Sequence, residues 1–212
     1  MSRVCPQCGE WCEEEPIDPG GPAVVCTFCH SAQPFLQLPL FVILGPSGAG
    51  KSTLSLQLPA ALPECVTLDT DILWGVLPAT KEKDYSDYHN LWLYIAKNIA
   101  QNDRPVVLCG TALPKQVEPC PQRRYFSTVY YLTLVCDDDV LVERLKARPA
   151  WRKSATEESL AEMLSFNRWL KEHAATTNPP MTLYDTTHRT VEQTVADSVA
   201  WIRLRLLEGA AQ

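Results

Sequence analysis

Residues 45–52 read Gly-Pro-Ser-Gly-Ala-Gly-Lys-Ser and match the phosphate-binding signature G-x-x-x-x-G-K-[S/T]. Glycines let backbone N–H groups curl around phosphate oxygens, and the amino end of a following helix adds positive potential. Lys51 is placed to reach the β- and γ-phosphates, and the Ser52 hydroxyl to ligate Mg²⁺. The residues expected to bind the triphosphate of ATP are Gly45, Pro46, Ser47, Gly48, Ala49, Gly50, Lys51, Ser52 and Thr53. A glycine-rich turn that matches by chance is the alternative, and the apolar run before the loop weighs against it.

Two Cys-x-x-Cys pairs near the amino end of the chain are separated by 17 residues. Four thiolates close a tetrahedron around Zn²⁺, and the segment resembles a zinc ribbon. The expected ligands of one structural Zn²⁺ are Cys5, Cys8, Cys26 and Cys29. Cys12 and His30 are weaker ligand candidates. A closed site of four cysteines has no open coordination position, so we assign it no catalytic role.

Two acids, Asp69 and Asp71, stand at the end of the next apolar run. The sequence contains no N-K-x-D motif, which a GTPase would use to read guanine. A motor or AAA-type ATPase would place an Asp-Glu pair at the end of a later core strand, but the run at 105–110 has no acid. The pattern therefore favours another class of phosphate-loop protein.

The elements that must position these residues alternate along the chain. Five apolar runs predict buried strands: Leu40–Leu44, Cys65–Thr70, Pro105–Gly110, Val129–Cys136 and Met181–Thr186. Helical patterns lie between them, notably Asp84–Gln101 and Thr190–Leu207. We predict an α/β fold of the P-loop NTPase type, with three α/β/α layers, a five-stranded parallel sheet and a small amino-terminal zinc ribbon. Cys65, Cys109 and Cys136 fall in strand patterns and are expected to be buried.

Residues 40–205 resemble the small P-loop kinases of metabolites, namely the shikimate, gluconate, adenylylsulfate and nucleoside kinases. The resemblance is carried by the phosphate loop, Asp69-Thr70-Asp71, Cys109–Leu113, an arginine-bearing segment after the fourth strand, and Asp185-Thr186-Thr187. It implies that Asp69 supports Mg²⁺ through water and that Asp71 meets the acceptor hydroxyl as a general base. The alternative for Asp71 is a cap on the helix that begins at Ile72.

The same resemblance implies a lid at about residues 144–156. Arg144, Arg148 and Arg152 recur every four residues, but Pro149 interrupts a continuous helix. We favour Arg148 and Arg152 as catalytic residues that neutralise charge on the transferring phosphate, with a solvated basic face as the alternative. The loop at 185–187 either lies near the adenine or caps the last helix.

Four aromatic residues fall where such kinases cover the acceptor: Trp74, Tyr85, Tyr88 and Trp92. Stacking would suit a nucleobase, although a core position is the simpler interpretation of each one. The favoured acceptor is a nucleoside, followed by a sugar acid such as gluconate. A 5′-hydroxyl polynucleotide kinase and a non-catalytic nucleotide-dependent binding module are further alternatives. The polynucleotide reading is weakened by the acidic ribbon and by the lack of an arginine just after Asp71.

Composition sets limits on partners and location. The chain has 212 residues, of which 46% are apolar, enough for a hydrophobic core. Its net charge of −6 argues against a broad basic surface that would bind nucleic acid. Residues 1–38 form the expected ribbon module and 39–212 the expected kinase domain. The sequence shows no secretory signal pattern or membrane span, so we expect a cytoplasmic protein that acts on a small molecule.

Overall fold

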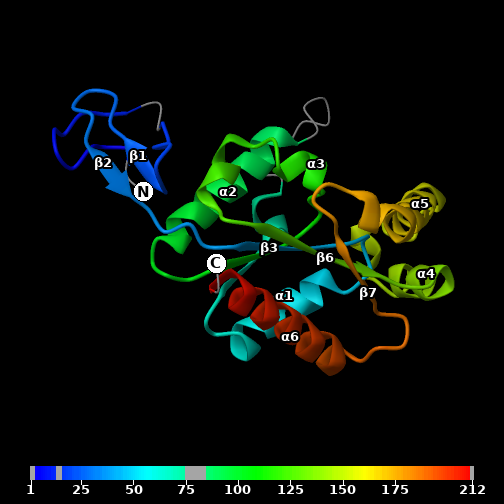
Figure 1. The fold of residues 1–212 in the computed structure, drawn as a ribbon. Helices are drawn as coiled ribbons and strands as arrows, with labels where there is room; N and C mark the ends of the chain where they lie inside the picture. Colours follow the sequence, from blue (N-terminus) through cyan, green and yellow to red (C-terminus); the bar gives the residue numbers. More distant parts are fainter. Residues whose placement is uncertain (1–2, 13–15, 75–84, 211–212) are drawn as a thin grey trace.

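The computed structural model describes residues 3–12, 16–74 and 85–210. Its main part is a five-stranded parallel sheet in the order β4-β5-β3-β6-β7, with helices on both faces (Figure 1). The strands are β3 (Leu40–Leu44), β4 (Val66–Asp69), β5 (Val106–Cys109), β6 (Val129–Val135) and β7 (Thr182–Asp185). The α-helices are α1 (Lys51–Ala61), α2 (Ser86–Ala100), α3 (Pro114–Val117), α4 (Asp138–Lys146), α5 (Glu157–His173) and α6 (Val191–Ala210). The predicted three-layer fold is thereby confirmed.

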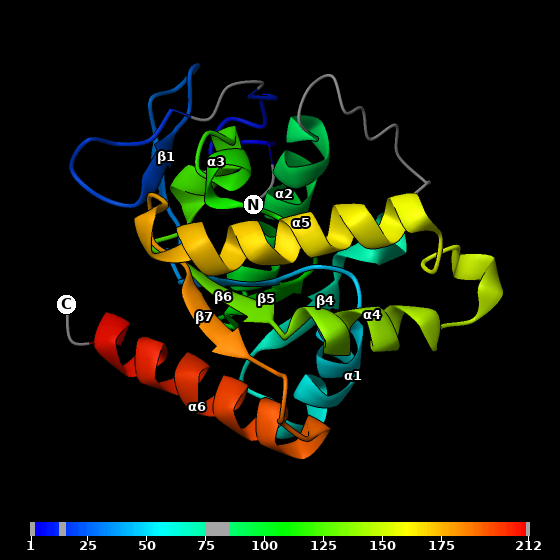
Figure 2. The ribbon, with the colours of Figure 1, turned by 90° about the vertical axis from the view of Figure 1, so that its right-hand side faces the viewer.

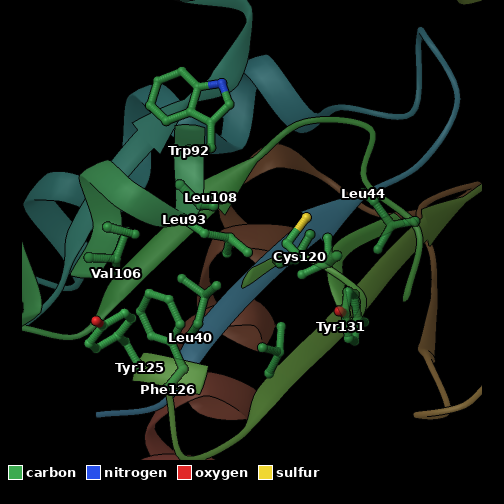
Figure 3. Packing of buried hydrophobic residues seen from close by; sticks show 14 of the residues in the cluster. Leu40, Leu44, Trp92, Leu93, Val106, Leu108, Cys120, Tyr125, Phe126 and Tyr131 are labelled. Atoms are coloured by element: carbon green, nitrogen blue, oxygen red, sulfur yellow. The ribbon is translucent and has the colours of Figure 1, made fainter. Parts of the chain in front are cut away.

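Central strand β3 shows why its sequence is a continuous apolar run. Leu40, Val42 and Leu44 pack into the core beneath α2 and α3, as Figure 3 shows in part. Phe41 and Ile43 alternate with them and pack into the opposite core, against α1 and α6. A strand buried on both faces has no polar positions to alternate with, which is typical of parallel sheets.

The expectation of five buried strands is wrong for the two edges of the sheet. All residues of β3 and β5 are buried, whereas those of β4 at one edge are half-buried and those of β7 at the other edge are half-buried or exposed. An edge strand has a neighbour on one side only, so its side chains are less covered.

Helix α2 begins at Ser86; Asp84, the expected start, lies outside the described residues. Tyr88 and Trp92 are buried in the core, as their helical spacing suggests. In α6 the expected apolar face packs on the sheet from Val195 onward, but Val191 is exposed at the helix start. Val191 and Val195 both face a cavity described below.

The amino-terminal segment forms a small antiparallel pair, β1 (Ala23–Val25) with β2 (Ala32–Pro34). It lies at the end of β3 opposite the phosphate loop (Figure 1). Phe35 packs edge-on against Tyr125 with ring centroids 5.0 Å apart, and it belongs to the core beneath α2. Leu36 and Gln101 exchange two hydrogen bonds, so this segment is tied to the end of α2.

Candidate functional site

The loop at residues 45–52 joins β3 to α1 in a conformation that needs glycine. Gly45, Gly48 and Gly50 have φ angles of 148°, 88° and 108°. A Cβ on Gly45 would lie 2.3 Å from the Leu134 carbonyl oxygen, so no side chain fits there. Positive φ angles at the start of a helix are the backbone conformation from which N–H groups can converge on a bound anion.

Lys51, the first residue of α1, folds back over this loop. Its Nζ donates to the carbonyl oxygens of Gly45 at 2.7 Å and Pro46 at 3.0 Å. Loss of hydration lowers the pKa of Lys51 to about 8; nearby Asp71 opposes this shift and nearby Arg148 adds to it. A phosphate group would replace the two carbonyls as the partner of this ammonium.

A cavity of about 360 Å³ opens over the loop, a volume in the usual range for small-molecule sites. It is lined by most of the predicted phosphate-binding residues, Ser47, Gly48, Ala49, Gly50, Lys51, Ser52 and Thr53. Gly45 and Pro46 lie beneath them, buried against the sheet. Asp71, Arg148 and Arg152 line the same cavity, so the structure brings the predicted catalytic residues together around the phosphate loop.

The two acids after β4 have different surroundings. Asp69 accepts a hydrogen bond from Ser55 Oγ at 3.3 Å, and the same hydroxyl donates to the Ser52 carbonyl at 2.9 Å. Ser55 thereby links Asp69 to the backbone of Ser52, whose hydroxyl is the other expected Mg²⁺ ligand. The Asp69 carboxylate also accepts the Asp71 backbone N–H at 3.0 Å, so the helix cap here is Asp69 and not Asp71. Asp71 turns toward the cavity.

Arg148 lies in the turn between α4 and the next short helix, and Arg152 ends that short helix. Helix α4 ends at Lys146, and η4 (Ala150–Arg152) follows Pro149, so the continuous helix is broken as expected. Burial and nearby Arg152 lower the pKa of Arg148, which nearby Asp71 partly offsets. Arg152 lies 4.9 Å from the centre of the exposed Trp151 ring. Two guanidinium groups close together favour an anion between them.

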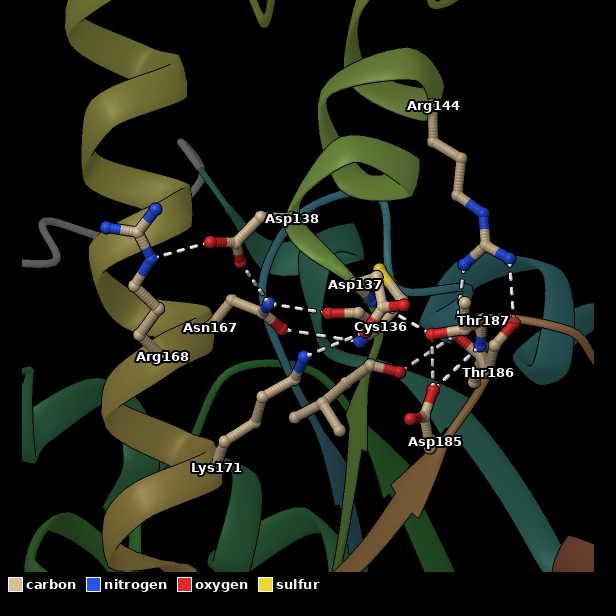
Figure 4. Close-up of polar contacts among 11 residues, drawn as sticks. Cys136, Asp137, Asp138, Arg144, Asn167, Arg168, Lys171, Asp185, Thr186 and Thr187 are labelled. Atoms are coloured by element: carbon tan, nitrogen blue, oxygen red, sulfur yellow. Dashed lines mark hydrogen bonds and ion pairs between the residues drawn. The ribbon is translucent and has the colours of Figure 1, made fainter.

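Arg144 also lines this cavity, although the sequence favoured Arg148 and Arg152 over it. Its guanidinium donates to Thr186 Oγ1 and to the Thr186 carbonyl, each at 2.9 Å (Figure 4). Asp185 accepts two bonds from Thr187 in the same loop. The cap of α6 is Thr190, whose hydroxyl accepts the Gln193 N–H, so the interpretation of residues 185–187 as a cap is wrong.

Helix α5 supplies two residues that support the site and that no sequence pattern indicates. Asn167 is fully buried and exchanges two hydrogen bonds with the Cys136 backbone after β6 (Figure 4). Met163 Sδ accepts the Ser47 N–H of the phosphate loop at 3.3 Å. Both residues look like ordinary members of an amphipathic helix, and only the packing of α5 on the sheet reveals their partners.

Trp74 stands out among the four aromatic residues named from the sequence. It is 58% exposed, whereas Tyr88 and Trp92 are buried. Its ring lies 5.6 Å from the rings of both Tyr85 and Tyr88, which support it from below. Trp74 is three residues after Asp71, so a supported aromatic surface lies on the same short segment as the cavity carboxylate.

The Cys-x-x-Cys pairs form two similar turns. Gly9 donates its N–H to the Cys5 carbonyl and His30 donates to the Cys26 carbonyl, and both donors have positive φ angles. The four sulfurs of Cys5, Cys8, Cys26 and Cys29 lie within 4.8 Å of one another.

The spacing of these sulfurs fits zinc. The sulfurs of Cys5 and Cys29 are 3.7 Å apart, as are those of Cys8 and Cys26. A tetrahedron with Zn–S bonds of 2.3 Å has edges of about 3.8 Å, so the cluster is compatible with a zinc ribbon. His30 is exposed and is not part of this group of four. Cys12 is not part of it either, but its sulfur lies beside that of Cys26.

The remaining cysteines lie elsewhere. Cys65, Cys109 and Cys136 are buried, as their strand positions predict. Burial raises the pKa of the Cys65 thiol to about 11. Cys120, which had no interpretation from the sequence, is buried and donates to the Gln116 carbonyl at 3.1 Å.

Residues 40–173 match the model of the AAA domain family. The chain matches this family although β5 ends without an acidic residue. An AAA-type ATPase was expected to carry an Asp-Glu pair at that position. No curated protein matches the sequence. Among the described residues, no helix is both long and apolar enough to cross a membrane.

Several solved structures share the fold at low sequence identity. A sugar kinase from Janibacter sp. HTCC2649 superposes with a TM-score of 0.58 and 15% identity, over 81% of this chain and 98% of that one. A gluconokinase from Sinorhizobium meliloti 1021 superposes with a TM-score of 0.55 and 20% identity, over 83% of this chain and 98% of that one. The shikimate kinase from Acinetobacter baumannii in complex with shikimate superposes with a TM-score of 0.50 and 19% identity, over 79% of this chain and 94% of that one. At these identities the likeness establishes a P-loop kinase-like fold.

Proposed function

Because the chain belongs to the AAA domain family, with a P-loop kinase-like fold, we propose that it is an ATP-dependent kinase of a small hydroxylated acceptor, with a nucleoside favoured. The observation that carries this proposal is the cavity of about 360 Å³ lined jointly by Lys51, Asp71, Arg148 and Arg152. A phosphate anchor, a carboxylate and two further cations around one space are the parts that phosphoryl transfer to a hydroxyl requires.

Each residue has a role that follows from its position. The loop N–H groups and Lys51 hold the β- and γ-phosphates, while Ser52 and Asp69 would hold Mg²⁺, which neutralises phosphate charge when bound. Asp71 orients the acceptor hydroxyl and takes its proton as the hydroxyl oxygen bonds to the γ-phosphorus, while the bond from that phosphorus to the β–γ bridging oxygen breaks and ADP leaves. Arg148 and Arg152 stabilise negative charge on the transferring group.

The preference for a nucleoside is supported by Trp74. The Trp74 indole is 58% exposed and lies against the rings of Tyr85 and Tyr88, so it offers a flat face on which a base could stack. A planar base stacked on Trp74 would bring a sugar hydroxyl toward Asp71, three residues earlier. A sugar acid, the second candidate, offers no flat face to this ring.

The test is ATP consumption by the zinc-loaded, full-length protein with a panel of nucleosides and sugar acids. Lys51→Ala serves as the blank, since it removes the phosphate anchor. We expect acceptor-dependent turnover with at least one nucleoside, and Asp71→Asn to lower kcat about 100-fold or more with ATP affinity nearly unchanged. Absence of turnover with every acceptor would leave the binding-module hypothesis in its place.

A pair of substitutions separates the acceptor classes. Trp74→Ala should raise KM for a nucleoside about tenfold, because stacking contributes roughly 1–3 kcal/mol per base. Trp74→Phe should retain most of the affinity, since it keeps a flat ring. An unchanged KM in Trp74→Ala, or turnover confined to sugar acids, contradicts the nucleoside assignment while leaving the kinase proposal in place.

A further inference from the structure

A fifth cysteine lies against the predicted zinc cluster. Cys12 Sγ is 3.6 Å from Cys26 Sγ, and both side chains are buried. Cys5, Cys12 and Cys26 pack together as a small core of their own within the ribbon. Among the described residues, the group of four mutually close sulfurs does not include Cys12. Cys12 is therefore a thiol that touches one metal-binding sulfur without completing the tetrahedron.

We propose that Cys12 and Cys26 are a disulfide-forming site through which hydrogen peroxide releases zinc from the ribbon. The inference rests on the zinc interpretation of the cluster and is independent of the kinase proposal. It assigns Cys12 a chemical role that the four-ligand site leaves open.

The position of Cys12 distinguishes it from the other close pairs. Cys5 with Cys29 and Cys8 with Cys26 are also 3.7 Å apart, but both sulfurs of each pair are predicted metal ligands. A disulfide in either pair would break two zinc–sulfur bonds at once, whereas Cys12 with Cys26 breaks only one. The two sulfurs need to approach by about 1.6 Å to reach the length of an S–S bond.

Neighbouring groups hold the Cys26 sulfur in place. It accepts the Cys12 S–H, and the Phe28 N–H at 3.4 Å. Cys8 is exposed and its sulfur is 3.7 Å from that of buried Cys26, so hydrogen peroxide, which is small and uncharged, can approach the Cys26 sulfur from that side. Burial of Cys12 and Cys26 then shields the product from large reductants, because thiol–disulfide exchange requires access to a sulfur.

The chemistry balances with hydrogen peroxide as the oxidant. The Cys26 thiolate attacks one peroxide oxygen, the O–O bond breaks, and hydroxide leaves, which gives a sulfenic acid at Cys26. The Cys12 thiol then attacks this sulfur, the S–O bond breaks, and water leaves with the thiol proton. The two sulfurs lose two electrons and the peroxide gains them. Zinc keeps three thiolates and its affinity for the ribbon falls.

The experiment uses the zinc-loaded, full-length protein, with a chromogenic zinc chelator during peroxide treatment and disulfide mapping by mass spectrometry afterwards. We expect a Cys12–Cys26 disulfide to form as zinc is released. Cys12→Ser should load about one zinc per chain and release it roughly fivefold more slowly. Cys120→Ser, which removes a buried cysteine outside the ribbon, is the matched control and should behave as the unmodified protein.

Three results would overturn the proposal. One is a first disulfide that joins Cys5 to Cys29 or Cys8 to Cys26. Another is equal zinc release from the unmodified protein and Cys12→Ser. The third is a failure of both Cys12→Ser and Cys12→Ala to bind zinc while remaining folded, which would make Cys12 a ligand. None of these readouts depends on phosphoryl transfer, so they are distinguishable from failure of the proposed kinase activity.

Discussion

Lys51 shows how the phosphate loop prepares a cation for its ligand. Within the part of the chain that the structure describes, its ammonium donates hydrogen bonds to two neutral partners, the carbonyl oxygens of Gly45 and Pro46. The two carbonyl groups stabilise the charged ammonium less than the water lost on burial would, so the pKa of Lys51 falls to about 8. Triphosphate oxygens would favour the charged form strongly and restore a high pKa. Nucleotide binding should therefore be coupled to uptake of a proton.

The affinity for an ATP analogue should fall with rising pH. Above pH 8 the free protein has lost the Lys51 proton while the complex retains it, so higher pH favours the free form. From pH 7 to pH 9 the affinity should drop about tenfold, as measured by titration with a fluorescent analogue at constant Mg²⁺. Lys51→Met should bind more weakly and lose this slope. The same slope in the variant would assign the proton to another group.

Gly110, just after β5, lies so close to Thr70 that the structure leaves no room for a side chain there. A Cβ at this position would lie 1.7 Å from Thr70 Oγ1 and 2.9 Å from Thr70 Cβ. Gly110→Ala should lower the free energy of unfolding by about 2 kcal/mol and shift Asp69 and Asp71, which flank Thr70. Chemical denaturation measures the effect, with Gly209→Ala as a control because its Cβ meets no atom within 4 Å. Partial recovery in the double variant with Thr70→Ala would trace the loss to this contact; an unchanged stability in Gly110→Ala contradicts it.

At the scale of elements, α5 is joined to the sheet through one buried amide. Asn167 Nδ2 donates to the Cys136 carbonyl at 2.7 Å and to Asp138 Oδ1 at 3.1 Å, and its Oδ1 accepts the Cys136 N–H at 3.4 Å. The end of β6 and the start of α4 are thus fixed to the helix that follows the lid. We therefore expect the position of the lid arginines to depend on this connection.

Asn167→Ala should therefore lower the free energy of unfolding by more than the loss of a few side-chain atoms would suggest. It leaves a buried N–H and a buried carbonyl at Cys136 without their partner, which costs about 2–4 kcal/mol of unfolding free energy. Arg168→Ala is the matched control on the same helix, because its ion pair with Asp138 at 2.6 Å involves a side chain that is 63% exposed. That pair should contribute less than about 1 kcal/mol. Equal losses in the two variants would mean that the amide does not anchor α5.

The sequence predicts those elements whose signal is local. The phosphate loop was recognisable because its chemistry needs consecutive residues, and β3 because burial on both faces removes every polar position. Met163 and Asn167 were missed because their partners lie 29 to 116 residues away and their own helix pattern is ordinary. The exposure of β4 and β7 was also hidden, since strand order and not composition decides which strands form the edges.

At the scale of the whole molecule, the ribbon and the kinase-like part share a core. Val24 and Phe35 belong to the same buried cluster as β3 and α2, and Phe35 lies 5.0 Å from Tyr125. Leu36 adds two hydrogen bonds to Gln101 at the end of α2. The ribbon has few apolar residues of its own, so metal binding is expected to supply much of its folding energy. A zinc ion at one end of the molecule should therefore stabilise the domain at the other.

Removal of zinc should lower the melting temperature of the entire protein in a single transition. Scanning calorimetry of the zinc-loaded protein, the chelator-treated protein and Cys29→Ser should show a common decrease of about 5 °C or more. Phe35→Ala supplies the decisive comparison, because it removes the ring that connects the two parts and should itself cost about 3 kcal/mol. In that variant the melting of the kinase-like part should become less sensitive to zinc, since the Phe35 ring contact is lost and only Val24 and the Leu36–Gln101 hydrogen bonds still connect the two parts. Two separate transitions in the unmodified protein, with the larger one unmoved by chelation, would show instead that the ribbon and the sheet fold independently.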